Sequence, residues 1–232
     1  MTAIREVCID TETTGLNPFE GDRLIEIGCL ELKGGKKTGE CFHRLINPER
    51  DVPEEAVNVH GITTEQLLNK PKFFEVVDDL LEFLQDSVII AHNSSFDMKF
   101  LNFELGRLGY GRIQNEVIDS LMLAKLKFPG QKNSLDNLCK RYGVDNSKRT
   151  FHGALLDAEL LADVYAKLKG GAQESFLEDR ETVMGYGTLE INGLLDRIKK
   201  REIRPSRNFR VSPEDQKRHD WFIETYVRKT SR

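Results

Sequence analysis

The stretch that decides the fold is residues 4–15, I-R-E-V-C-I-D-T-E-T-T-G. Apolar residues alternate through residues 4–9, which is typical of a β-strand. Asp10 and Glu12 follow where we expect this strand to end. Residues two apart on an extended chain share a face, so both carboxylates point into the same space. Two carboxylates that close disfavour each other's charge unless a cation lies between them, although Asp, Thr and Gly are also ordinary turn residues.

Outward from this stretch, two further strands come first, and then strands alternate with helices. Alternation returns in residues 24–32, and glycines at 34, 35 and 39 predict a hairpin into residues 40–46. Helical spacing predicts an amphipathic helix at residues 73–84, before a short apolar strand at residues 87–91. Further helices are expected at residues 95–108, 121–127, 134–141 and 154–168. This order predicts an α/β fold with a mixed β-sheet flanked by helices.

Two later stretches place polar residues beside predicted elements. Residues 91–97, A-H-N-S-S-F-D, join a strand to a helix, a position where α/β sheets commonly form their sites. Helix capping by a serine, with Asp97 favoured by the helix dipole, explains this stretch equally well. In residues 152–158, H-G-A-L-L-D-A, Asp157 lies near the apolar face of a predicted helix, where a carboxylate needs a partner or a metal ion. His152 precedes that helix and suits a base near neutral pH.

The four acidic residues have the ligand chemistry of a hard divalent cation. Oxygen ligands favour Mg²⁺ or Mn²⁺ over zinc, since histidine and cysteine are not clustered. Two such ions can hold a phosphodiester, activate a water molecule and neutralise the leaving oxygen. The cofactors we expect are therefore two divalent cations, Mg²⁺ or Mn²⁺, at the residues Asp10, Glu12, Asp97 and Asp157.

Taken in order, the motifs D-x-E-T-T-G, H-N-x-x-F-D and H-x-A-L-x-D-A resemble the three exonuclease motifs of the DEDDh 3′→5′ exonucleases. The five positions that name this family are Asp10, Glu12, Asp97, His152 and Asp157. Three connecting stretches, V-H-G-I at 59–62, F-P-G before N-S-L-D at 128–136, and D-N-S-K-R-T at 145–150, are similar to one branch of it. That branch is the epsilon-subunit family of bacterial DNA polymerase III. The likeness covers residues 1–170 by motif.

This resemblance implies a ribonuclease-H-like core that removes mismatched nucleotides from a DNA 3′ end as nucleoside monophosphates. Asp10 would bridge two metal ions, the first of them held also by Glu12 and Asp157. Asp97 would support the second ion through its waters, and His152 would take the proton from the attacking water. The residues expected to bind the substrate are Asp10, Glu12, Thr13, Gly15, His60, Asn93, Phe96 and Asp157.

Charge is distributed unevenly over the 232 residues. The net charge is −6 in residues 1–169, −3 in residues 170–188 and +5 in residues 189–232, which together give −4. We expect an exonuclease domain over the first range, an acidic linker over the second and a basic tail over the third. The negative charge of the first range indicates a low intrinsic affinity for DNA. Two divalent ions would offset part of that charge.

The linker and the tail carry candidate partner-binding segments. Residues 173–177, Q-E-S-F-L, resemble the peptides with which bacterial replication proteins bind the sliding clamp, through Gln173, Ser175, Phe176 and Leu177. The tail has too few apolar residues for an independent domain, and its aromatic run at residues 221–226 is typical of a docking segment. The family implies docking on the polymerase subunit, with a theta-like small subunit as a further partner. A basic arm that binds nucleic acid is the alternative.

Two other functions fit parts of the sequence. An exoribonuclease that trims RNA 3′ ends would use the same motifs, because these do not distinguish the sugar. A non-catalytic adaptor of a polymerase is disfavoured by the complete set of five catalytic positions. Four cysteines without C-x-x-C spacing, and the lack of a long apolar stretch, indicate a reduced, cytoplasmic protein without a membrane span, and the resemblance implies a bacterial one.

Overall fold

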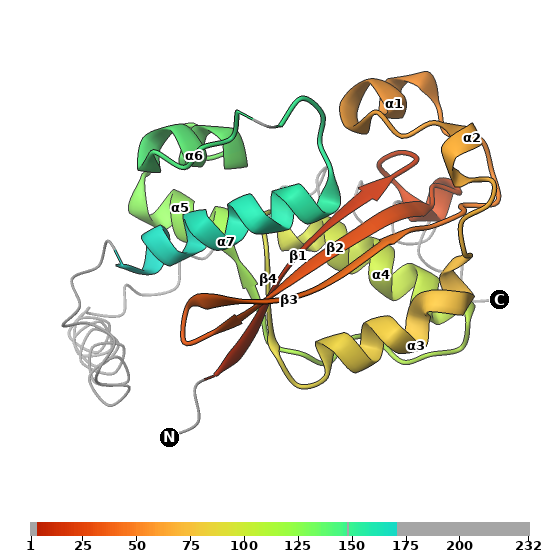
Figure 1. The fold of residues 1–232 in the computed structure, drawn as a ribbon, viewed down its shortest axis with the longest axis horizontal. Coiled ribbons are helices and arrows are strands. Elements are labelled where there is room, and N and C mark those ends of the chain that lie inside the picture. Colours follow the sequence, from red (N-terminus) through yellow and green to blue (C-terminus); the bar gives the residue numbers. More distant parts are fainter. Residues whose placement is uncertain (1–3, 148, 171–232) are drawn as a thin grey trace, which may run out of the picture. The chain divides into compact units, whose positions relative to one another are not determined.

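The computed structural model describes residues 4–147 and 149–170. Five strands form one sheet in the order β3-β2-β1-β4-β5, and helices lie on both of its faces (Figure 1). This confirms the predicted α/β class. The clamp-like segment and the basic tail lie outside the described residues. Within the described ranges, no helix has the length and apolar character needed to cross a membrane.

The central strand is β1 (Arg5–Thr13), which continues through the acidic triplet instead of ending at Asp10. It pairs antiparallel with β2 (Leu24–Lys33) along its whole length and parallel with β4 (Val88–Ala91) only as far as Cys8. Asp10, Thr11 and Glu12 therefore lie on β1 just beyond the residues that pair with β4. This is the edge where a helix following a parallel strand begins.

Of the two edge strands of the sheet, the sequence predicted one and missed the other. The expected hairpin is present, and it connects β2 to β3 (Lys36–Leu45), which forms one edge of the sheet. The other edge is β5 (Val117–Asp119), which pairs parallel with β4 and was not predicted. Three residues are too few for an alternating pattern, so this strand leaves no periodic signal in the sequence.

One face of the sheet is covered by α3 (Phe73–Leu84) and α4 (Ser94–Arg107) (Figure 1). Helix α3 has the predicted bounds because its apolar residues recur at helical spacing and are buried against the sheet. Val7 and Ile9 of β1 belong to the same core, so the odd-numbered β1 side chains point to this face. Full burial of each large aliphatic side chain contributes about 1.5–3 kcal/mol.

The opposite face is covered by α5 (Ser120–Lys127), α6 (Leu135–Tyr142) and α7 (Ala154–Gly170). Cys8 of β1 packs in this second core together with Leu160, Leu161 and Val164 of α7. The even-numbered side chains of β1 therefore point toward α7. Asp10 and Glu12 continue that row, so the strand places both carboxylates beside the first turn of α7.

Three short helical elements were also missed by the sequence analysis. They are η1 (Pro18–Glu20), α1 (Glu54–His60) and α2 (Thr64–Leu67), each two turns or fewer in length. Helix α2 begins with a capping box formed by Thr63 and Gln66, which was present in the sequence as a signal. Helix α1 ends at Gly61 in the left-handed conformation, φ 73°, and this glycine places His60 at a buried helix end.

Candidate active site

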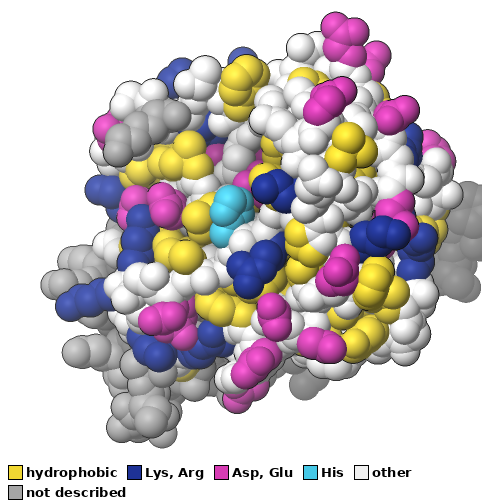
Figure 2. All heavy atoms as spheres, turned by 45° about the vertical axis from the view of Figure 1, so that its right-hand side comes forward, with side chains coloured by type: hydrophobic (Ala, Val, Ile, Leu, Met, Phe, Trp, Pro, Cys, Tyr) yellow, Lys and Arg dark blue, Asp and Glu magenta, His cyan; other side chains and the backbone are white. Residues whose placement is uncertain are grey.

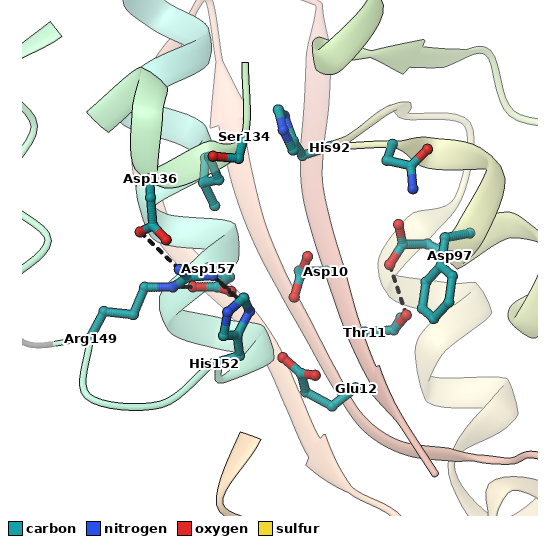
Figure 3. Close-up of a pocket in the computed structure, with 13 residues that line it drawn as sticks. Asp10, Thr11, Glu12, His92, Asp97, Ser134, Asp136, Arg149, His152 and Asp157 are labelled. Atoms are coloured by element: carbon teal, nitrogen blue, oxygen red, sulfur yellow. Dashed lines mark hydrogen bonds and ion pairs between the residues drawn. The ribbon is translucent and has the colours of Figure 1, made fainter. Parts of the chain in front are cut away.

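All five predicted catalytic residues line a single cavity of about 330 Å³ (Figure 3). Asp10 and Glu12 come from β1, Asp97 from the first turn of α4, and Asp157 from the first turn of α7. His152 lies in the loop that precedes α7. The side chains of Glu12, Asp97 and Asp157 are buried, whereas the ring of His152 remains about half exposed.

Asp97 reaches the cluster from the opposite face of the sheet. Thr11 points away from its two acidic neighbours on β1, and its hydroxyl donates a hydrogen bond of 2.7 Å to the Asp97 carboxylate. This bond ties the start of α4 to the central strand. As Figure 3 shows, the Asp97 carboxylate and that of Asp10 therefore face the same cavity from different layers of the fold.

Asp157 approaches β1 because α7 begins almost in contact with β2. In the β1–β2 register Gly28 lies directly opposite Asp10. A Cβ atom at Gly28 would overlap the backbone of Ala154 and Leu155, so only glycine permits this approach.

A hydrogen bond holds the same helix start in place. Glu26, which lies opposite Glu12 in the register, accepts a bond of 3.0 Å from the backbone N–H of Ala154. This N–H is one of the donors at a helix N-terminus that lack a partner within the helix, and the carboxylate satisfies it. The first turn of α7, and with it Asp157, is thus fixed over β1 and β2.

Three of the side chains are close enough to share one ligand. Glu12, His152 and Asp157 each offer an atom, and these atoms all lie within 4.8 Å of one another. The carboxylates of Asp10 and Asp97 border the same space. Predominantly oxygen donors arranged around one cavity fit a hard divalent cation such as Mg²⁺ or Mn²⁺.

The pKa values of the carboxyl groups reflect their burial and the repulsion between their negative charges. Burial raises the pKa of Glu12 to about 8, with the charge of Asp157 as the next cause. Burial likewise raises the pKa of Asp97 to about 7, even though the hydrogen bond from Thr11 opposes the shift. The pKa of Asp10 lies well above its usual range because of burial and the neighbouring Asp97, Glu12 and Asp157 charges. A cation in the cavity would relieve this repulsion, so the residues present fit one.

Arg149 belongs to the site, although the sequence analysis gave it no role. Its guanidinium donates to both carboxylate oxygens of Asp157 at 2.6 Å, and it forms an ion pair of 2.9 Å with Asp136. A third contact, of 2.8 Å, joins it to Nδ1 of His152. Because a guanidinium only donates, Nδ1 accepts this bond and the neutral imidazole carries its proton on Nε2.

Asp157 consequently differs from the other three carboxyl groups. Burial alone would raise its pKa, but the side-chain contacts with His152 and Arg149, together with the Arg149 charge, hold the pKa below its usual range. Asp157 therefore keeps its negative charge at neutral pH, while the raised pKa of Glu12 favours its protonated form. The signal for Arg149 in the sequence was the D-N-S-K-R-T stretch, which carries no periodic or ligand-like pattern of its own.

The predicted substrate-binding residues divide into two groups. Asn93 and Phe96 line the cavity, and Asn93 has a left-handed backbone, φ 69°, at the start of α4. Thr13, Gly15 and His60 do not line it. The Thr13 hydroxyl instead donates to the Gly15 carbonyl oxygen at 2.6 Å, and Nδ1 of His60 accepts the backbone N–H of Ile62 at 3.0 Å, so both side chains support local backbone.

His92 is a further cavity residue to which the sequence analysis assigned no role. It lies directly after β4, and its Nδ1 is 2.9 Å from the Ser120 hydroxyl oxygen. Burial lowers the pKa of His92, so its ring is neutral at physiological pH. Its place after a strand, within the H-N-x-x-F-D motif, was the signal that could have identified it.

The chain is similar to known proteins in both sequence and structure. Residues 7–165 match the family model described as Exonuclease. The DNA polymerase III subunit epsilon of Rickettsia typhi is 45% identical over 230 residues, which cover 97% of each chain. The corresponding subunit of Escherichia coli K12 is 42% identical over 209 residues, 86% of each chain.

Solved structures share the fold. Exonuclease X in complex with 5′-overhanging duplex DNA matches with a TM-score of 0.57 and 25% identity, over 72% of this chain and 92% of that one. The nuclease domain of 3′hExo, a DEDDh family member bound to rAMP, matches with a TM-score of 0.65 over 74% of this chain and 94% of that one. At 18% identity, the second likeness concerns the fold alone.

The raised pKa values predict that stability in a chelating buffer falls as the pH rises. A carboxyl group whose pKa is raised by folding contributes stability that is present at low pH and is lost as the pH rises through the folded-state value. With Asp97 at about 7 and Glu12 at about 8, the melting temperature in EDTA should fall between pH 5.5 and 8.5. Mg²⁺ at pH 8.5 should restore it, because the cation replaces the lost protons.

Differential scanning fluorimetry across this pH range measures both effects. The matched control is Glu12→Gln, which removes one raised pKa and should flatten the decline in EDTA. A melting temperature in EDTA that declines equally in the wild type and the variant would contradict the assignment.

Proposed function

The chain belongs to the epsilon-subunit family of DNA polymerase III, which are proofreading 3′→5′ exonucleases, and on this premise we propose how its cavity carries out the reaction. The five predicted catalytic residues in the cavity carry out hydrolysis of the last phosphodiester bond of a DNA strand and release a nucleoside monophosphate. The observation that carries this proposal is the convergence of four carboxyl groups from β1, α4 and α7 on one cavity, where the pKa values of Asp10, Glu12 and Asp97 are raised. Such a cluster is costly to fold and is typical of a functional site.

The cofactors in this proposal are two divalent cations, Mg²⁺ or Mn²⁺. When bound, they supply the positive charge that holds the phosphate and stabilises the negative charge on the leaving oxygen. Asp10, Glu12 and Asp157 would hold the first ion, and Asp10 and Asp97 would hold the second. The proximity of the Glu12 and Asp157 ligand atoms supports the first assignment.

His152 acts as the general base that accepts the proton of the attacking water. Its loop is fixed by a backbone hydrogen bond of 3.1 Å to the carbonyl oxygen of Val59 in α1. Its ring is oriented by Arg149, which occupies the lone pair of Nδ1. A base needs a free lone pair, so the contact between Arg149 and Nδ1 of His152 breaks in the reacting complex. The guanidinium then remains next to Asp157 and has a free N–H donor for the phosphate.

The terminal nucleotide binds against Phe96 and Asn93, which line the cavity beside the acidic residues. Thr13, Gly15 and His60 act indirectly. They stabilise the backbone after β1 and at the end of α1.

An exoribonuclease is the runner-up function. The curated relatives reported above are subunits of a DNA polymerase, which favours DNA as the substrate.

Beyond the described residues, we propose that residues 189–232 dock on the polymerase subunit and that residues 173–177 bind the sliding clamp. The end of α7 at Gly170 supports an exonuclease domain over residues 1–169, followed by the acidic linker and the basic tail. The Rickettsia typhi subunit aligns over 97% of this chain, which includes tail residues. A retained tail of similar length supports a role in the same assembly.

Replacement of Asp10 by Asn, and separately of His152 by Gln, should lower metal-dependent digestion of a single-stranded DNA 3′ end by at least about a hundredfold. The first change removes a central negative charge of the cluster, and the second removes the base. Digestion is followed by gel electrophoresis of an oligonucleotide labelled at its 5′ end.

Asp86→Asn is the matched control, because Asp86 is an exposed acidic residue in the turn between α3 and β4 and does not line the cavity. Melting temperatures verify that each variant folds. Wild-type activity in a folded Asp10→Asn or His152→Gln protein would remove that residue from the mechanism.

A chain truncated after Gly170 distinguishes the two roles of the tail. If residues 189–232 dock on the polymerase, the truncated protein keeps its nuclease rate but no longer co-elutes with the polymerase subunit in size-exclusion chromatography. If they form a DNA-binding arm, the nuclease rate falls and depends less on salt. Retained co-elution would refute the docking proposal.

A further inference from the structure

A second cavity of about 750 Å³ lies along α4, outside the catalytic cluster. Its walls are formed by η1, by one side of α4 and by the loop that follows α4. We call this cavity, between Phe19 and Arg112, the α4 groove. The predicted site did not include any of its residues.

Positive charge dominates the wall of the α4 groove. Lys99, Arg107 and Arg112 line it, and no acidic side chain is among its lining residues. Arg107 forms an ion pair of 3.3 Å with Glu104, and its side chain is still 44% exposed. Figure 2 shows acidic and basic side chains interspersed over one face of the molecule. The groove therefore offers a local positive surface on a chain whose net charge is −4.

Aromatic rings complete the wall. Phe19 is 75% exposed, and its ring packs edge-on against Phe103, with ring centroids 5.3 Å apart. The second ring fixes the first without covering its outer surface. Exposed aromatic rings beside cationic side chains are the combination that binds single-stranded nucleic acid, since bases stack on the rings and phosphates pair with the cations.

The α4 groove adjoins the catalytic cavity. Phe96, in the catalytic cavity, and Lys99, in the groove, are neighbours on one side of α4, and the Lys99 ammonium lies 5.7 Å from the Phe96 ring centre. A hydrogen bond of 2.7 Å from that ammonium to the carbonyl oxygen of Leu16 holds it in place. Arg107 follows about 12 Å further along the helix, at 1.5 Å per residue. This span corresponds to roughly two to four nucleotides.

We propose that the α4 groove binds the single-stranded DNA segment immediately 5′ of the terminal nucleotide. Lys99, Arg107 and Arg112 contact its phosphates, and one base stacks on Phe19. The inference rests on the proposed function, because it assumes that the 3′ end lies in the catalytic cavity. It predicts that substrates longer than the groove bind more tightly than those that fill the catalytic cavity alone.

Steady-state kinetics of the full-length protein on two substrates test this inference. One is the p-nitrophenyl ester of thymidine 5′-monophosphate, which reaches only the catalytic cavity, and the other is an eight-nucleotide oligothymidylate. Phe19→Ala and Arg112→Glu should each raise KM for the oligonucleotide by at least about fivefold. Neither variant should change kcat or KM for the ester. Arg112→Gln should also lower the slope of log KM against log salt by about 0.7, the effect of one lost phosphate contact on a single strand.

Matched controls come from the other side of the molecule. Leu126→Ala removes an equally exposed apolar side chain, and Lys125→Glu reverses an exposed charge, both on α5. Neither should change KM for the oligonucleotide.

An unchanged KM for the oligonucleotide in both groove variants would overturn the inference. So would wild-type KM values combined with weaker association with the polymerase subunit, since the groove would then bind protein. If the wild-type protein hydrolyses neither substrate, the proposed function itself is refuted. If the wild-type protein hydrolyses both substrates and the groove variants have the same kinetic constants, only the groove proposal is refuted.

Discussion

The active site depends on how closely α7 approaches the sheet. The residue of β2 opposite Asp10 is Gly28, and the space that a Cβ would take there is filled by the backbone at the start of α7. One hydrogen bond, from the Ala154 N–H to Glu26, then fixes the rotation of the helix. Without this contact Asp157 would not be held beside Asp10 and Glu12, because the hydrogen bonds from Tyr165 and Lys169 of α7 to Glu6 of β1 lie near the other end of the helix.

The same contact creates the electrostatic character of the cavity. Three carboxyl groups with raised pKa values share a space with one whose pKa is lowered. The difference arises from Arg149, which neutralises Asp157 but does not contact the others. Stability from the two cores on either side of the sheet offsets the repulsion that remains. The protein thus supplies one fixed cation beside Asp157, and metal ions would balance the negative charge that remains.

Much of this arrangement was predictable from the sequence because its signals are local. The alternation around Asp10 and Glu12 placed both carboxylates on one face, and the spacing of apolar residues located α3 to the residue. The contacts that the sequence could not show are long-range ones. Arg149 meets Asp136 from thirteen positions away, and nothing in a single glycine at position 28 indicates that a helix will pack on it. Strand β5 and helix α2 were missed because they are too short for a periodic pattern.

The most direct test of this account is the Mn²⁺ affinity of Gly28→Ala, measured by electron paramagnetic resonance and compared with the wild type and with Gly111→Ala. A Cβ at Gly111 meets no atom within 4 Å, so that control should bind Mn²⁺ like the wild type. The account predicts that Gly28→Ala still folds, as judged by circular dichroism, but binds Mn²⁺ at least about tenfold more weakly, because α7 moves away from β1 and carries Asp157 with it. Wild-type Mn²⁺ affinity in Gly28→Ala would contradict the claim that this close approach builds the site.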